Sequence, residues 1–438
     1  MKIIIAGAGE VGFHLAKLLS FESQDIILID TNRESLAYAS SHLDIRVVHG
    51  NATSISVLKE ANVQNTDLLI GVTSSETTNI TTCALAKQLG AKHTIARITN
   101  TEFIHNKDEV GFEKIGIDEL ISPESLAAKE IELLLNQSAF NDTFEFEDGA
   151  LLMIGLILSR TAAFVGKTVK EVAELYPNLE YMPIAIQRYA TQYTLIPRGD
   201  TQFKEGDQVY FTTTQLGIDE IYRLTGKVKV EIKNVMILGG SKIGTKTARD
   251  LCKHSFNVKL VEKEKEKAFE IADELPNCLV IKGDGRDVDL LDEEQISDMD
   301  AFIAVTGNSE TNIMSCLVAK SKGVKKTIAL VENMDYFQLS HSIGIDTLIN
   351  KKLLGEILAM TKLNNMNAET LEFLVTSTSR VCNQLIKKID IPRSAIIGGI
   401  VRNGKGMIVL GDFTIIAGDR VVVCCLPQSI KKVEKLFV

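Results

Sequence analysis

The 438-residue chain repeats itself, and this repeat constrains the fold more than any other feature. A shift of about 232 residues brings KIIIAGAGEVGFHLAKLL, which starts at Lys2, onto NVMILGGSKIGTKTARDL, which starts at Asn234. Four further blocks match in the same order: IILID with VKLVE, VVHGNA with VIKGDG, DLLIGVTSSETTN with DAFIAVTGNSETN, and IGIDELI with IGIDTLI. Matching blocks in one order indicate that the chain arose by duplication.

Within each copy, short runs rich in Ile, Val and Leu alternate with longer amphipathic stretches. In the first copy the apolar runs cover residues 2–6, 26–30, 46–49, 67–72, 93–98 and 119–121. Nearly continuous apolar strands that alternate with helices are typical of a parallel sheet covered on both faces. We therefore predict an α/β fold with one doubly wound, Rossmann-like unit in each copy.

A different pattern follows each Rossmann-like unit. Strand-like ALLMIGLIL, helical TVKEVAEL and turn signals such as KEGDQ follow the first copy, and a shorter version follows the second. This pattern predicts a small α+β domain, for which dimerisation or subunit packing is favoured over ligand binding. The predicted boundaries are 1–136 and 231–360 for the Rossmann-like units, and 142–227 and 368–438 for the small domains.

The first strand leads into the glycine pattern GAGEVG. Gly7 allows a tight turn, Gly9 removes the Cβ that would block a pyrophosphate, and Gly12 lets the helix lie close to its strand. Asp30, at the end of the second strand, is placed to accept hydrogen bonds from ribose hydroxyls and favours NAD over NADP. Nucleotide binding is the preferred interpretation, and a bare packing loop is the alternative. The candidate residues are Gly7, Ala8, Gly9, Glu10, Val11, Gly12 and Asp30.

The second copy departs from this pattern because Ser241 stands where the middle glycine belongs. Its Cβ would crowd a pyrophosphate, although its hydroxyl and Lys242 offer compensating phosphate contacts. A working second site and a decayed structural copy are both open at this stage. The candidate residues are Gly239, Gly240, Ser241, Lys242, Ile243, Gly244 and Glu262.

Polar residues at other strand ends are expected to face the same crevice, since ligands of open α/β sheets lie beyond the carboxyl ends of the strands. Asn51 and Asp284 follow the third strands, and Thr73 and Thr306 follow the fourth strands. Ordinary turn and cap roles are equally open for these four residues. Arg97 is placed for a phosphate or a subunit contact, or is an exposed strand-end charge.

Composition narrows the function classes. A net charge of −9 argues against broad attraction to nucleic acids or anionic membranes, and no apolar stretch approaches the length of a membrane helix. The N-terminus has no secretory pattern, so we expect a cytoplasmic protein. The seven histidines are dispersed without metal-ligand spacing, and neither GxxxxGK[ST] nor GxSxG occurs. We therefore expect no metal and no catalysis, with an NAD-dependent oxidoreductase or a structural adaptor with a relic second site as alternatives.

The duplicated order of GxGxxG, an acidic strand end, G-N/D-A/G, T-x-x-x-x-T-N and IGID resembles the TrkA family over essentially the whole chain. Members are cytoplasmic regulatory subunits of bacterial Trk potassium-uptake systems, built from two pairs of RCK (KTN) domains. The resemblance implies binding of NAD(H) and of ATP or ADP, and a homo-oligomer (dimer or tetramer) on the inner face of an integral-membrane potassium transporter. It also implies nucleotide contacts from Gly7 to Val11, Asp30, Thr73, Ser74 and Arg97, and from Gly239 to Ile243, Glu262, Thr306 and Gly307. Ala52, next to Asn51, is a further candidate.

Overall fold

A computed structural model describes residues 1–21, 24–100, 102–138, 140–147, 149–176, 180–188, 193–227, 230–331, 344–350, 360–362 and 366–437. The chain divides into two compact units. The first contains Met1–Ala127, and the second contains Ala128–Ile349 and Leu358–Val438. The boundary falls inside helix α7 (Pro123–Asn136), which follows the first Rossmann-like sheet.

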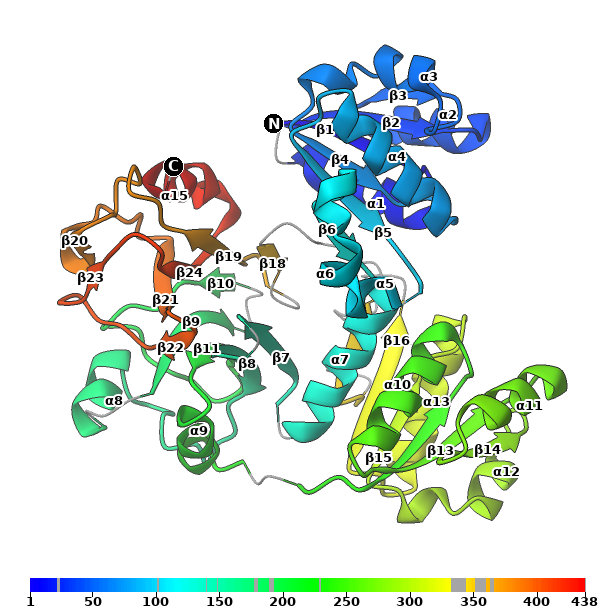
Figure 1. The fold of residues 1–438 in the computed structure, drawn as a ribbon. Helices are drawn as coiled ribbons and strands as arrows, with labels where there is room; N and C mark the ends of the chain where they lie inside the picture. Colours follow the sequence, from blue (N-terminus) through cyan, green and yellow to red (C-terminus); the bar gives the residue numbers. More distant parts are fainter. Residues whose placement is uncertain are drawn as a thin grey trace. The chain divides into compact units, whose positions relative to one another are not determined.

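The first unit is built on a six-stranded parallel sheet with the order β3-β2-β1-β4-β5-β6 (Figure 1). The order reverses between β1 and β4, which creates the crevice where open α/β sheets bind ligands. The strands are β1 (Lys2–Ala6), β2 (Asp25–Asp30), β3 (Arg46–His49), β4 (Leu68–Gly71), β5 (His93–Arg97) and β6 (Glu119–Ile121).

Helices connect the parallel strands of the first unit. Because such crossovers are right-handed, α1 and α2 lie on one face of the sheet and α4 lies on the other. The sheet is buried between them, so β1 and β4 read as continuous apolar runs. The helices are α1 (Glu10–Phe21), α2 (Arg33–His42), α3 (Ile55–Glu60), α4 (Glu76–Gln88), α5 (Glu102–His105) and α6 (Lys107–Val110).

The second unit contains the second Rossmann-like sheet, with the corresponding order β14-β13-β12-β15-β16-β17. The prediction of two doubly wound units is therefore confirmed. Its strands are β12 (Asn234–Leu238), β13 (Asn257–Glu262), β14 (Leu279–Lys282), β15 (Ala301–Ala304), β16 (Lys326–Val331) and β17 (Thr347–Asn350). Its helices are α10 (Lys242–Lys253), α11 (Lys265–Glu274), α12 (Val288–Glu293) and α13 (Ser309–Ser321).

The aspartate of each IGID block has the same structural task in both copies. Asp118 accepts hydrogen bonds from the amide and hydroxyl of Thr94 on β5 and pairs with Lys87 of α4 at 2.7 Å. Asp346 bonds the amide and hydroxyl of Thr327 and pairs with Lys320 at 2.6 Å. The repeated motif therefore ties the outer strand to its neighbour and to a helix.

A small α+β domain follows each Rossmann-like unit, as predicted. The first domain has a sheet of order β10-β9-β11-β8-β7, and the second has β18-β19-β24-β21-β22 with a separate β20-β23 pair. The first comprises β7 (Asp142–Phe146), β8 (Leu151–Ile157), α8 (Val169–Leu175), β9 (Tyr181–Arg188), β10 (Tyr193–Leu195), β11 (Gln208–Thr213) and α9 (Gly217–Thr225). The second comprises β18 (Met360–Lys362), β19 (Glu369–Leu374), β20 (Gln384–Leu385), β21 (Ala395–Arg402), β22 (Lys405–Met407), β23 (Thr414–Ile415), β24 (Arg420–Cys425) and α15 (Ile430–Phe437).

The two small domains pack against each other within the chain. Buried residues of both, including Met153 and Val422, form one apolar cluster. Thr212 is fully buried and donates a hydrogen bond to the carbonyl of Gly398 at 2.7 Å. Arg198 donates to three backbone carbonyls of the second domain, at 2.8 to 3.1 Å. The packing partner of each small domain is thus the other small domain of the same chain.

The segment that leads into the first small domain also contacts the second Rossmann-like unit. Lys326, at the start of β16, is 3% exposed and donates to the carbonyl of Phe140 at 2.7 Å. Asn141 donates to the carbonyl of Asp346, and Thr347 donates to the carbonyl of Asn141. These contacts join the two copies. Among the helices in the described parts of the chain, none has the length and apolar character needed to cross a bilayer.

Candidate functional site

The first crevice opens where the order of the first sheet reverses, and two glycines shape its floor. Gly7 has φ +119°, and a Cβ there would lie 2.8 Å from the amide nitrogen of Thr73, which follows β4. A Cβ at Gly12 would lie 1.8 Å from the carbonyl oxygen of Gly7. Only glycine fits at these positions, as expected for a tight turn and for close packing of α1 on β1.

Gly9 and Asp30 leave space and hydrogen-bonding capacity for a ligand. A Cβ at Gly9 would meet no atom within 4 Å, so the space above this turn is open. Asp30 accepts a hydrogen bond from the amide of Ala8 at 2.5 Å and from the amide of Asn32 at 2.7 Å. The carboxylate therefore anchors the glycine turn to the end of β2. Because a carboxylate has about four acceptor positions, it retains capacity for ribose hydroxyls.

Asn79 holds the loop after β4 through hydrogen bonds, and it is not among the residues predicted from the sequence. Its side-chain oxygen accepts from the amide and the hydroxyl of Thr73, and its amide group donates to the carbonyls of Thr73 and Arg97. Asn79 is 1% exposed, so these bonds have no competition from water. The repeated T-x-x-x-x-T-N motif ends on this residue, and that was the signal available in the sequence.

Arg97 forms an ion pair with Glu124 at 3.1 Å, which rules out the interpretation as an exposed strand-end charge. Its side chain is 18% exposed and that of Glu124 is 9% exposed. Within the part of the chain that the structure describes, the Arg97 Nε and the second oxygen of Glu124 are buried without a hydrogen-bond partner. Such atoms are rare in native proteins, and these two are available to hydrogen-bond a ligand.

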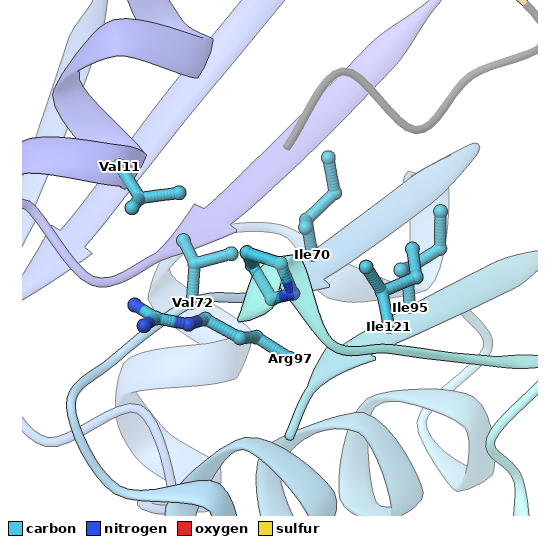
Figure 2. A pocket seen from close by; sticks show the side chains of 7 residues that line it. Val11, Ile70, Val72, Ile95, Arg97 and Ile121 are labelled. Atoms are coloured by element: carbon cyan, nitrogen blue, oxygen red, sulfur yellow. The ribbon is translucent and has the colours of Figure 1, made fainter. Parts of the chain in front are cut away.

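A small pocket beside the glycine turn contains Arg97. Its other lining residues are apolar and come from the start of α1, the ends of β4 to β6 and the start of α7. Figure 2 shows the Arg97 side chain passing beside Val72, with its guanidinium on the Val11 side of the pocket. The full lining is Val11, Ile70, Val72, Ile95, Arg97, Ile121 and Pro123. The pocket therefore places the Arg97 guanidinium, which is paired with Glu124, beside apolar side chains.

The remaining predicted residues of the first copy lie in the loops after β3 and β4 and at the start of α1. Asn51 follows β3 and its side chain accepts from the amide and hydroxyl of Thr53, a local turn. Ala52 is buried, whereas Glu10 is exposed and Ser74 lies next to Thr73 in the loop after β4. Turn and cap roles are thus present at Asn51 and Thr73, and they are compatible with a ligand above.

The second crevice keeps the frame of the first. Gly239 has φ +104° and lies against Thr306, and a Cβ at Gly244 would lie 2.0 Å from the carbonyl of Gly239. Asn312 bonds the amide, the hydroxyl and the carbonyl of Thr306 and the carbonyl of Leu330, as Asn79 does in the first copy. Gly307, like Thr306, lies in the loop after β15.

The Ser241 hydroxyl forms hydrogen bonds with the protein backbone of the second crevice. Its hydroxyl donates to the carbonyl of Val305 at 2.7 Å and accepts from the amide of Gly244 at 3.2 Å. The only proton of this hydroxyl is therefore used within the protein, and one amide of the first turn of α10 is already capped. A compensating phosphate contact from the Ser241 hydroxyl is not available in this arrangement. Lys242 and Ile243 follow as the first residues of α10.

The carboxylate of the second crevice is more enclosed than Asp30. Glu262 is 8% exposed and accepts from the amides of Gly240 and Glu264, both at 2.9 Å, and from Lys267 at 3.3 Å. Burial alone would raise its pKa, but these donated hydrogen bonds and the Lys267 charge outweigh burial and lower the pKa. The lack of a Cβ at Gly240 leaves room for Ile271 and Glu262. At the two positions that match Gly240 and Ile271, the first copy has Ala8 and Ala39.

Arg97 and Asp284 mark two further differences between the crevices. Leu330 occupies the strand position that corresponds to Arg97, so the second copy lacks that cation. Asp284, in the place of Asn51, bonds Arg286 at 2.7 Å and Lys263 at 3.0 Å. Among the described residues, no group of three or more His, Cys, Asp or Glu side chains is arranged to hold a metal ion.

Comparisons with known proteins agree with this duplicated architecture. The TrkA-N domain model matches residues 3–123 and 235–351, and the TrkA-C domain model matches residues 154–226 and 370–438. The Trk system potassium uptake protein TrkA of Halomonas elongata is 32% identical over 453 residues, which cover 100% of this chain and 98% of the relative. TrkA homolog 1 of Methanosarcina mazei is 31% identical over 456 residues and 100% of both chains.

Solved structures show the same fold at lower identity. The GsuK channel bound to NAD has a TM-score of 0.63 and 16% identity, over 100% of this chain and 78% of the channel. The RCK domain of GsuK has a TM-score of 0.62 and 15% identity, over 100% of this chain and 94% of that domain. Because both family models match twice and the relatives align over their full length, the chain belongs to the TrkA family of Trk system potassium uptake proteins.

Proposed function

We propose that this chain is a nucleotide-sensing regulatory subunit that gates a membrane potassium transporter, and that it binds NAD(H) or ATP/ADP without altering them. The observation that carries the proposal is the first crevice. There an open glycine turn, an anchored carboxylate and a half-buried arginine, whose Nε has no hydrogen-bond partner among the described residues, meet at the switch point of the sheet. The relatives named Trk system potassium uptake protein TrkA supply the transport context.

The residues of the first crevice fit an adenine dinucleotide. The amides from Gly9 to Val11 lie at the start of α1, where the helix dipole favours the anionic pyrophosphate. Asp30 would accept the hydroxyls of the adenosine ribose, and Arg97 would meet a phosphate or the second half of the ligand. The likeness in fold to a GsuK channel bound to NAD supports this assignment.

A non-catalytic role accords with how the polar groups of the first crevice are used. The Glu124 carboxylate is paired with Arg97, and the Thr73 hydroxyl is bonded to Asn79. A dehydrogenase needs a proton donor or acceptor beside the nicotinamide, positioned for a substrate. Neither group is positioned for that task. Hydride transfer from bound NADH to an added substrate would favour the oxidoreductase alternative.

Repeated sites suit a switch because a ligand shifts an equilibrium only by its differential affinity for two states. A tenfold preference supplies about 1.4 kcal/mol. Four coupled sites would supply about 5.6 kcal/mol, close to the roughly 5.5 kcal/mol that converts a 1:99 population into 99:1. We propose that occupancy moves the Rossmann-like units, and that a homo-oligomer, held on the inner face of the membrane by its integral-membrane partner, passes the movement to the pore.

The test is co-purification with the integral-membrane partner, followed by potassium flux in vesicles with and without NADH, ATP and ADP. We expect nucleotide-dependent flux with the native chain and nucleotide-independent flux with Asp30→Ala. Asp25→Ala, in an exposed carboxylate at the start of the same strand, is the matched control and should behave as the native chain. Potassium flux that is the same with and without nucleotides in the native complex would contradict the proposal.

A further inference from the structure

Three cationic side chains surround the adenosine side of the second crevice. Lys267 contacts Glu262 at 3.3 Å, and Lys263 and Arg286 contact Asp284 at 3.0 and 2.7 Å. Lys263 and Arg286 follow β13 and β14, next to the strand ends that meet an adenosine ribose in this fold. The cations therefore lie beside the ribose position, away from the pyrophosphate turn at the start of α10.

The matching positions of the first crevice are neutral. Thr31, Ser35 and Thr53 stand where the second copy has Lys263, Lys267 and Arg286. The second copy also gains two acids, because Asp284 replaces Asn51 and Glu264 replaces Asn32, so the cations outnumber the new acids. The two crevices share a backbone frame and differ in charge at these five matched positions, with a net gain of one positive charge in the second.

Glu262, the carboxylate that would normally repel a ribose phosphate, is buried and hydrogen-bonded in the second crevice. One oxygen of Glu262 accepts from Gly240 and Lys267, the other accepts from Glu264, and the residue is 8% exposed. Discrimination against a 2′-phosphate depends on an accessible carboxylate at this strand end, and acceptance depends on a nearby cation. Glu262 is buried and paired, and the charged groups beside it are the exposed Lys263, Arg286 and Glu264 and the half-buried Lys267, so cations are in excess.

We propose that the second crevice binds an adenine nucleotide that carries a phosphate on its ribose, whereas the first binds the unphosphorylated ribose. The inference rests on the proposed nucleotide-binding function and assigns a different class of nucleotide to each copy. Lys263 and Arg286 would release part of their bonding to Asp284 and donate to the ribose phosphate. Lys267 would keep Glu262 neutralised.

The test is calorimetric titration of the full chain with NAD+, NADP+, adenosine 2′,5′-bisphosphate and adenosine 3′,5′-bisphosphate. Asp30→Ala weakens the first crevice so that the second is observed. The triple variant Lys263→Thr/Lys267→Ser/Arg286→Thr gives the second crevice the residues of the first. We expect it to bind the ribose-phosphorylated ligands at least tenfold more weakly, with NAD+ binding at the first crevice unchanged. The two bisphosphates distinguish a 2′-phosphate from a 3′-phosphate.

The reverse graft, Thr31→Lys/Ser35→Lys/Thr53→Arg, changes exposed or half-buried positions and should add NADP+ binding to the first crevice. Equal affinity of the native chain and the triple variant for ribose-phosphorylated ligands would overturn the inference. Binding of NAD+ alone by the native chain would also overturn it and leave the proposed function intact. A chain that binds none of the four ligands would contradict the inference, and it would contradict the proposed function as well if ATP and ADP also failed to bind.

Discussion

The two Rossmann-like units have the same frame and different crevices. In both, a glycine with positive φ lies against a threonine that an asparagine holds with three hydrogen bonds, and the same asparagine donates a fourth to a carbonyl of the neighbouring strand. Above that frame, the first copy has an open turn at Gly9 and the second has Ser241 bonded to Val305 and Gly244. Duplication has therefore kept the residues that shape the backbone, while the residues that would face a ligand have diverged.

The largest effect is expected from breaking the frame. Gly12→Ala and Gly244→Ala place a Cβ 1.8 and 2.0 Å from a backbone carbonyl, so each should destabilise its unit by about 3 kcal/mol. Urea unfolding measures the loss. Gly9→Ala, which meets open space, is the control and should cost under about 1 kcal/mol. Native stability of Gly12→Ala would show that the helix does not pack on the turn as described.

The asparagine networks should respond alike in both copies. Asn79→Ala and Asn312→Ala each remove a buried side chain that bonds a threonine loop and a neighbouring carbonyl, so we expect a loss of about 2 kcal/mol in each case. Hydrogen exchange at the amides of Thr73 and Thr306 reports the local opening. A large effect in one copy beside none in the other would contradict the equivalence of the frames.

The copies should differ in how stability depends on pH. Burial lowers the pKa of Lys326 to about 8, whereas His93, at the matching place in the first sheet, is exposed. The unfolded chain keeps the lysine proton up to about pH 10.4, so the stability that Lys326 contributes rises with pH from about 8 to 10.4. The slope is at most about 1.4 kcal/mol per pH unit.

Chemical unfolding of the native chain and of Lys326→Met across this pH range isolates the contribution of Lys326. The difference in unfolding free energy between the two proteins should grow as the pH rises. His93→Met is the matched control and should produce no such trend. A difference that is constant with pH would show that Lys326 does not release its proton on folding.

A smaller effect is expected from exchanging the middle residue of the two turns. Ser241→Gly frees the amide of Gly244 and removes the Cβ over the turn, at a cost of a few tenths of a kcal/mol in helix capping. Nucleotide affinity at the second crevice should rise by about tenfold, or 1.4 kcal/mol. Gly9→Ser should produce the opposite change at the first. If neither titration differs from native, Ser241 is not what separates the crevices.

The elements of the Rossmann-like units were predictable because their signals are local. The apolar run at 2–6 matches β1; in the first small domain the signal is equally local, since TVKEVAEL predicts α8, whose first turn Thr168 caps together with Glu171. The sites were less predictable because their partners are distant in sequence. The sequence near Arg97 does not indicate its ion pair with Glu124. The sequence near Lys326 does not indicate that this lysine is buried and donates a hydrogen bond to the carbonyl of Phe140. The sequence predicts a Ser241 hydroxyl that is available to phosphate, because its bond to Val305 forms only in the folded sheet.

The most direct test of the central claim is calorimetric titration of NADH into the full chain, the Asp30→Ala variant and the Glu262→Ala variant. We predict saturable binding to the native chain, a loss of at least tenfold in affinity at the first crevice with Asp30→Ala, and no change there with Glu262→Ala. Absence of saturable binding to the native chain, or equal binding by the native chain and Asp30→Ala, would contradict the account.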